Sequence, residues 1–354
     1  MPHPSFNLLD IRLGGEARRR IERNGLRPDD IACIPAAAGG PKGLALLPFD
    51  RLFAREWMPR LRAVELIGAS IGAWRMASLA QGDPLAALDR LQHAYVREQN
   101  YDERPSPSQV AVVCRGLARS VFGASAFALR AGVALSVITA RARGALADDR
   151  SRLAFGRVAL LNAASRRWLA NHMERVVFHA GAPSRLPPAF DAFGLTQTAL
   201  TADNIEAALL ASGSIPLVCD PVRDVRAAPP GDYWDGGLID YHLLLPYERF
   251  DGIVLYPHFV PYVTPGWLDK FLPWRKRPRR HHWLANVILI APSRAMLDRL
   301  PDRRLPDRSD FYRYGQDHAA RIDAWERAIA ESQRFAEATL RWLEAPDTSI
   351  ARPL

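Results

Sequence analysis

The sequence has few cysteines and no long uninterrupted hydrophobic run. Only three cysteines occur among 354 residues, Cys33, Cys114 and Cys219, and none forms a CxxC pair or stands beside a cluster of histidines. Their scarcity argues against a disulfide framework and against a structural metal site, and it favours a reducing cytoplasm. The longest apolar stretch, residues 121–140, is interrupted by Arg130, so we expect no membrane-spanning helix.

We also expect no signal peptide, because residues 1–10 contain no basic segment followed by an apolar core. We therefore expect a cytoplasmic protein that is soluble or bound peripherally to a membrane. The net charge of +9 comes mostly from arginine and would attract anionic lipid or nucleic acid, but it does not choose between them. Hydrophobic residues make up 48% of the chain, which is enough for one large α/β domain or two smaller ones.

Strand and helix patterns alternate near the start of the chain. Residues 30–35 form a short apolar run before a Gly/Pro-rich turn, and residues 44–57 have apolar side chains at helical spacing. A second apolar run at 63–67 and a second helical pattern at 73–80 repeat the arrangement. This alternation predicts a mainly parallel sheet with helices on its faces.

The rest of the chain predicts a mixture of elements. Residues 84–150 look mostly helical and suggest a helical insertion, and a further helix is expected to begin at Thr201. Strand-like runs follow at residues 175–179, 217–219, 252–256 and 286–290. The strongest helical period is near the C-terminus, with an apolar stripe of Ile322, Trp325, Ile329, Ala336, Leu340 and Leu343.

Residues 68–72 (GASIG) match the pattern G-x-S-x-G between a predicted strand and a predicted helix. In a nucleophile elbow, the serine stands in a sharp strand-to-helix turn, and Gly68 and Gly72 would let neighbouring backbone pass close by. The following helix would point its positive N-terminal end at Ser70. The alternative is an ordinary glycine-rich turn with a surface serine.

A glycine-rich loop precedes the first predicted helix. Gly39, Gly40 and Gly43 would let backbone N–H groups converge on one point, as in an oxyanion hole, and Lys42 adds positive charge there. The loop lacks the spacing of a P-loop or a dinucleotide-binding motif, so a phosphate cradle is disfavoured. An ordinary turn remains an alternative for this loop taken alone.

Asp235 precedes a pair of glycines, Gly236 and Gly237, in the segment YWDGG. An Asp-Gly turn is common by itself, but a serine nucleophile must have a base nearby. In a Ser-His-Asp triad a histidine would follow the acid, and His242 and His258 are the candidates. Neither lies in a clear loop, so both are expected to be structural, and the triad is the weaker alternative.

The order of the glycine loop, the G-x-S-x-G elbow and the distant D-G-G resembles the patatin-like phospholipase family, which uses a Ser-Asp dyad. Residues 211–216 (ASGSIP) resemble a further segment that the family carries between the elbow and the Asp. The resemblance covers roughly residues 30–245. One departure is that Ala37 and Ala38 stand where the family's loop usually has glycines, so the oxyanion donors differ in detail.

The resemblance implies a three-layer α/β fold and a serine-dependent lipid acyl hydrolase of the phospholipase or esterase type. Ser70 would be the nucleophile, Asp235 its base, and Gly39, Gly40 and Gly43 the oxyanion loop. The substrate would be a lipid ester, with no metal and no organic cofactor. A lipid acyltransferase on the same fold, or a catalytically silent lipid-binding or scaffold protein, are the alternatives.

Three regions follow from these patterns. Residues 1–29 would be an N-terminal extension, 30–250 the catalytic domain, and 251–354 a C-terminal extension of the same domain. Within the last region, residues 271–283 mix five Arg or Lys with aromatic side chains, which is typical of a peripheral anchor on anionic lipid. A solvated basic loop is the alternative there, and no nucleic-acid partner is expected because no binding motif accompanies the charge.

Overall fold

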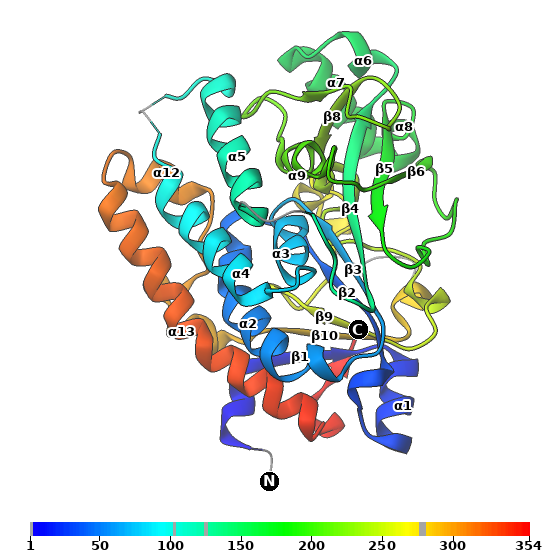
Figure 1. Cartoon of the computed structure of the whole chain (residues 1–354), viewed down its shortest axis with the longest axis vertical. Helices are drawn as coiled ribbons and strands as arrows, with labels where there is room; N and C mark the ends of the chain where they lie inside the picture. The colour runs from blue at the N-terminus through cyan, green and yellow to red at the C-terminus, as the bar shows by residue number, and fades with distance from the viewer. Residues whose placement is uncertain (1–2, 102–103, 124–126, 276–280) are drawn as a thin grey trace.

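The computed structural model describes residues 3–101, 104–123, 127–275 and 281–354. In this part of the chain eleven strands form one mixed sheet, in the order β11-β1-β10-β9-β2-β3-β4-β5-β6, with β8 paired to β4 and β7 to β8 (Figure 1). The strands are β1 (Leu9–Leu13), β2 (Ile31–Ala36), β3 (Val64–Ala69), β4 (Val133–Ala142), β5 (Met173–Ala180), β6 (Leu195–Ala199), β7 (Val222–Arg223), β8 (Asp232–Asp235), β9 (Ile253–Pro257), β10 (Val287–Pro292) and β11 (Arg352–Pro353). Most neighbouring pairs are parallel, which confirms the predicted α/β class.

Helices cover the sheet. Figure 1 shows α2, α3, α4, α5 and α13 gathered beside one another, and α6, α7 and α8 together near β4 and β5. The helices are α1 (Gly15–Asn24), α2 (Leu47–Glu56), α3 (Ile71–Leu79), α4 (Pro84–His93), α5 (Pro107–Phe122), α6 (Ala145–Asp148), α7 (Arg152–Ala164), α8 (Arg166–Leu169), α9 (Ile205–Gly213), α10 (Gly237–Asp240), α11 (Arg294–Leu297), α12 (Ser309–Tyr314) and α13 (His318–Glu344). Of the helices described, none has the length and apolar character needed to span a bilayer.

Strands β2 and β3 are buried at every residue, which explains their continuous apolar sequences. Glu65 is the one charged residue in β3. Its carboxylate can be buried because it accepts several hydrogen bonds. It accepts hydrogen bonds from Ser136 Oγ at 3.0 Å, from Ser184 Oγ at 3.1 Å and from the Arg185 N–H at 3.1 Å. A buried carboxylate with donors on both oxygens is compatible with a close-packed sheet centre.

The C-terminal helix confirms the strongest helical period of the sequence. Helix α13 packs on α2 and buries most of its predicted apolar stripe, while Ile322 is partly buried. Asp317 caps its first turn by accepting from the Ala320 N–H at 2.9 Å. Trp325 also donates from Nε1 to Asp310 at 2.8 Å, which ties α13 to the preceding helix, α12.

The prediction that residues 84–150 form a helical insertion is wrong in its second half. Helices α4 and α5 occupy the first half, but Val133–Ala142 is the longest strand of the sheet and lies between β3 and β5. This strand is buried on both faces, so its sequence has no polar–apolar alternation to reveal it. Its β-branched residues were the available signal.

Two smaller expectations also differ from the structure. Residues 217–219 form a turn in which Leu217 has φ 68°, and the nearby strand is β7 instead. The helix expected at Thr201 begins at Ile205, behind a turn in which Asn204 Oδ1 accepts from the Thr201 N–H at 2.8 Å. Within the predicted N-terminal extension, β1 pairs antiparallel with β10 and so belongs to the sheet.

A buried ion pair joins α2 to α3, the helix that follows the elbow. Arg75 in α3 donates to Asp50 in α2 from Nε at 2.6 Å and from a terminal nitrogen at 2.8 Å. Both side chains are almost fully buried. Burial raises the pKa of Asp50, and the Arg75 guanidinium opposes that rise. Arg51 in α2 also forms an ion pair, with Asp89, whose side chain is 70% exposed.

Replacing Asp50 by alanine leaves the Arg75 charge buried without its partner, so Asp50→Ala is expected to lower the free energy of unfolding by about 3–5 kcal/mol. The matched control Asp89→Ala removes an exposed pair and is expected to cost about 0–1 kcal/mol. Urea unfolding followed by circular dichroism measures both. Equal losses in the two variants would contradict the burial of the Asp50–Arg75 pair.

Candidate active site

Ser70 stands in the turn between β3 and α3, where the sequence predicted an elbow. Its backbone has φ 55° and ψ −132°, a region that residues other than glycine rarely adopt. Such a conformation costs about 1–3 kcal/mol and is maintained only by the surrounding structure. The strain is therefore concentrated at the residue whose hydroxyl the motif presents.

The two motif glycines let strands and helix approach closely. A Cβ on Gly72 would lie 1.9 Å from the Ala36 carbonyl oxygen, and a Cβ on Gly68 would lie 2.5 Å from Ala73. These positions admit only hydrogen at Cα, since real Cβ atoms do not come so near to backbone. The glycines of the elbow thus serve the packing of α3 on β2 and β3.

The register of the sheet brings Asp235 to Ser70. Strand β3 pairs with the first part of β4 up to Ala69↔Ile138, and β8 continues along the same edge with Thr139↔Asp235. Ser70 follows Ala69 directly, so its side chain meets the end of β8. The Ser70 Oγ–H donates to Asp235 Oδ2 at 2.8 Å, and both residues are buried.

The segment 211–216 holds both partners in place. Ser212 Oγ accepts from the Ser70 N–H at 2.9 Å and donates to the Ile138 carbonyl at 2.7 Å. Two residues later, the Ser214 carbonyl accepts from the Asp235 N–H at 2.7 Å. The sequence showed this segment only as a resemblance, and its role in fixing the two backbones required the structure.

The carboxyl group of Asp235 is tuned by opposing effects. Burial raises its pKa above the usual value for an aspartate, whereas the nearby Arg308 cation and the hydrogen bond from Ser70 lower it. The Gly237 N–H donates to Oδ1 at 2.7 Å and also favours the ionised form. Asp235 can therefore accept a proton at a raised pKa while its orientation stays fixed.

The histidine alternative has no geometric support. The Ser70 hydroxyl donates a hydrogen bond to the Asp235 carboxylate. Among the described contacts, neither His242 nor His258 has a hydrogen bond to either of these residues. The two imidazoles pack against each other with ring centroids 4.4 Å apart. Burial lowers the pKa of His242 well below its usual range and that of His258 to about 3, so both are neutral.

The glycine loop lies beside the pair. Gly39 lines the same small cavity as Asp235, and Gly40 begins the 3₁₀ segment Gly40–Leu46 with φ 56°. Gly43 does not line this cavity, and a Cβ there would be 2.9 Å from the Ile71 side chain. The Ala38 N–H donates to the Tyr241 carbonyl at 2.9 Å, so that group is occupied.

Two cavities border the Ser70–Asp235 pair. One of about 490 Å³ is lined by Ser70 and by mainly apolar and aromatic side chains, among them Trp74, Val110 and Phe311. The other, of about 70 Å³, is lined by Asp235, by the glycine loop and by charged groups. Arg308 and Ile215 line both cavities.

Arg308 and Lys270 are residues of this site that the sequence did not indicate. Both line the small cavity, and both come from the C-terminal part of the chain, away from the recognised motifs. Lys42, by contrast, was noted for its charge, and the structure pairs it with Asp307. Burial raises the pKa of Asp307, but the hydrogen bonds from Lys42 and Ser309 outweigh it and hold the pKa at about 2.

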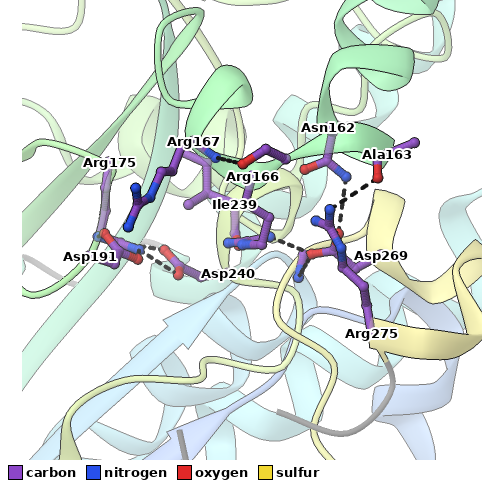
Figure 2. A network of polar contacts seen from close by, with 12 residues as sticks. Asn162, Ala163, Arg166, Arg167, Arg175, Asp191, Ile239, Asp240, Asp269 and Arg275 are labelled. Carbon is purple, nitrogen blue, oxygen red and sulfur yellow. Dashed lines mark hydrogen bonds and ion pairs between the residues drawn. The ribbon is translucent and has the colours of Figure 1, made fainter. Parts of the chain in front are cut away.

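A network of buried ion pairs holds the backbone that follows Asp235. Figure 2 shows Arg175 facing Asp191 and Asp240, and Arg166 and Arg275 meeting at Asp269. Asp240 ends α10, the short helix that begins at Gly237. The Arg175–Asp240 contact of 2.8 Å therefore ties the D-G-G turn to β5.

Asp269 secures the same turn from the other side. It is fully buried and also accepts from Asn162 Nδ2 at 3.0 Å. Arg166, its partner, donates at 2.9 Å to the carbonyl of Ile239 in α10 (Figure 2). The network thus connects α7, α8 and the loop after Trp267 to the helix behind Asp235.

The predicted surface anchor at 271–283 is only partly exposed. Phe271 and Trp274 are 63% and 70% exposed, but Trp283 is 7% exposed and packs edge-on against Phe190, which corrects its place in that anchor. Arg275 is engaged with Asp269. The basic residues at 276–280 lie outside the described residues.

The geometry supports covalent catalysis through a serine. A strained, buried serine donates a hydrogen bond to a carboxylate, and Gly39 of the glycine loop lines the same cavity as that carboxylate. A sequence model described as patatin-like phospholipase matches residues 39–245. The chain belongs to the patatin-like phospholipase family. Membership of this family supports lipid acyl hydrolysis at the family level, while no curated protein matches the chain.

Because a Cβ on Gly72 would strike the Ala36 carbonyl, Gly72→Ala is expected to lower the free energy of unfolding by at least about 1–3 kcal/mol. Gly82→Ala is the matched control, since a Cβ there meets nothing within 4 Å, and it is expected to stay within about 0.5 kcal/mol of the wild type. Chemical denaturation distinguishes the two. A Gly72 variant as stable as the control would refute the close approach of β2 and α3.

Proposed function

We propose that this patatin-like phospholipase family member hydrolyses carboxylic esters of lipids through a Ser70–Asp235 dyad. The observation that carries the proposal is the 2.8 Å hydrogen bond from Ser70 Oγ to Asp235 Oδ2 at a strained strand-to-helix turn. A serine hydroxyl is a weak nucleophile at neutral pH and must transfer its proton as it attacks. Asp235 is the group in position to receive it.

In the first half of the reaction, Ser70 Oγ attacks the ester carbonyl and its proton passes to Asp235. The carbonyl oxygen becomes an oxyanion, for which the N–H groups of Gly39 and Gly40 and of Ile71 at the start of α3 are our proposed donors. These N–H groups come at or before the first residues of helical segments, where none is used within the helix. Gly43 then has a packing role instead.

In the second half, the tetrahedral intermediate collapses and the alcohol leaves with the proton held by Asp235. Ser70 then carries the acyl group as an ester. Asp235 next takes a proton from water, which attacks the acyl carbonyl, and the proton returns to Ser70 as the fatty acid leaves. Each step balances without a metal or an organic cofactor.

The large cavity supports a lipid acyl chain as the group transferred to Ser70. Its volume of about 490 Å³ and its lining by Ile71, Trp74 and Phe311 suit an apolar chain whose carbonyl end reaches Ser70. The exposed Phe271 and Trp274 follow Lys270, which lines the small cavity, in the chain. We expect them to contact a lipid surface. That surface contact remains a prediction.

A fluorophosphonate probe, which reacts with activated serines, is expected to label the wild type. Ser70→Ala should abolish labelling and ester turnover, because the reacting oxygen is removed. Asp235→Asn should reduce turnover by at least about a hundredfold, since the amide cannot take the proton. His242→Asn serves as the control.

The readouts are gel fluorescence of the labelled protein and product analysis by mass spectrometry with a lipid ester. Labelling that persists in Ser70→Ala would overturn the nucleophile. A loss of turnover in the folded His242 variant equal to that of Asp235→Asn would restore the triad. Transfer of the acyl group to an added alcohol in preference to water would favour the acyltransferase.

Activity should depend on pH through Asp235. The base acts only when deprotonated, so kcat/KM on a neutral ester should fall as pH drops through its raised pKa. Arg308 lowers that pKa, so Arg308→Gln should move the acidic limb to higher pH. Profiles of kcat/KM against pH measure the shift, with Arg55→Gln, an exposed residue of α2, as control. A limb that moves to lower pH would contradict this role of Arg308.

A further inference from the structure

The two cavities at the dyad differ in chemistry. The large one is mainly apolar, whereas the small one is lined by Lys42, Lys270 and Arg308 together with Asp235 and Asp307. Ile215 and Arg308 form walls of both, so the cavities lie on either side of the Ser70–Asp235 hydrogen bond. An ester has two parts, the acyl group and the alcohol, and the cavities offer each part a separate place.

The Arg308 side chain lines the small cavity. Among the described residues its side chain makes no hydrogen bond and no ion pair, although it is only partly exposed. The neighbouring carboxylates already have other partners, because Asp307 pairs with Lys42 and Asp310 pairs with Arg304. Asp235 accepts hydrogen bonds from Ser70 and Gly237, and Arg308 acts on it through its charge. A Cβ on Gly40 would lie 2.9 Å from Arg308 Nε, so the guanidinium lies directly over the glycine loop.

Lys270 is the second cation of the small cavity that has no ion pair among the described residues. Its ammonium group lies over the rings of Trp267, Phe271 and Tyr241, at 4.5, 4.8 and 5.8 Å from their centroids. Burial, followed by the positive charges of Lys42 and Arg308, lowers its pKa to about 8. Lys270 is still mostly protonated at neutral pH, and an anion in the cavity would stabilise that charge.

The lining groups and the size of the cavity restrict the ligand. Arg308 offers a planar set of donors that suits the oxygens of phosphate, and Lys270 adds a point charge. A cavity of about 70 Å³ has room for several water molecules or one tetrahedral phosphate. In a glycerophospholipid, glycerol carbons alone separate the phosphate from the acyl esters, so the two groups can occupy adjacent cavities.

We propose that Lys270 and Arg308 bind the phosphate on the alcohol side of the substrate, so that phosphate-bearing lipid esters are preferred over neutral ones. This inference rests on the proposed ester hydrolysis at Ser70. It assigns the choice of substrate to residues outside the segment 39–245 that the family model matches. The apolar cavity receives the acyl chain, and the charged cavity receives the group that leaves.

The test compares kcat/KM for short-chain phosphatidic acid and for the diacylglycerol with the same chains, both below their aggregation limits. The ratio of the two values is the readout, since it cancels effects on the dyad itself. We expect the wild type to favour the phosphate ester at least tenfold. Lys270→Gln and Arg308→Gln should each lower the ratio about tenfold, the change that corresponds to ~1.4 kcal/mol.

Arg55→Gln is the matched control, because it removes an exposed cation of α2 outside both cavities. Measurements are made above the acidic limb of each variant, and circular dichroism verifies folding. A wild-type ratio near one, or a ratio that neither cavity variant changes, overturns the inference. If the fluorophosphonate probe labels Ser70 and diacylglycerol is still hydrolysed, that failure leaves the proposed function intact. An enzyme that neither labels nor hydrolyses either ester refutes the proposed function itself.

A second arm separates a lipid headgroup from free phosphate. Inorganic phosphate is titrated against diacylglycerol hydrolysis in the wild type and in Lys270→Gln. A preference for phosphatidic acid without inhibition at millimolar phosphate supports the lipid headgroup. Inhibition that Lys270→Gln weakens, with no preference between the esters, overturns the headgroup assignment and identifies a site for free phosphate.

Discussion

The site depends on one hydrogen bond between residues that are 165 positions apart in the chain, from Ser70 Oγ to Asp235 Oδ2. Its geometry is set by the edge of β4, which pairs with β3 over its first part and with β8 over the next. A shift of one residue in either pairing would turn the side chains to the opposite face and separate the two groups. The register of three strands therefore sets the contact between Ser70 and Asp235.

Much of the surrounding structure maintains that contact against an energetic cost. Ser70 has a strained backbone, and Asp235 is a buried carboxylate that loses hydration. Ser212 fixes the elbow by accepting from the Ser70 N–H, while the ion pairs of Arg175 and Asp269 secure the helix after Asp235. Buried ion pairs contribute little net stability, but they specify one arrangement of the groups that they connect.

The two sides of the dyad receive different environments from different parts of the chain. The family segment, residues 39–245, provides the elbow, the glycine loop and Asp235. The C-terminal part adds Lys270 and Arg308 to the small cavity, and Phe311 to the large one. In this proposal, the reaction belongs to the shared segment, whereas the choice of the alcohol part of the substrate depends on residues that follow it.

The α/β class, the elbow and the C-terminal helix could be predicted from the sequence, because each has a local signature in spacing or turn chemistry. Asp235 was named as the partner of Ser70 through the order of the motifs and the family resemblance, since an Asp-Gly turn is common by itself. The sequence-based prediction failed at β4, since a strand buried on both faces has no alternation, and at residues 217–219, where a short apolar run forms a turn. Tertiary structure alone decided that Ala38 gives its N–H to Tyr241, that Gly43 packs against Ile71, and that Arg308 stands beside Asp235. These are contacts between distant segments, and a sequence pattern carries no signal for them until the chain has folded.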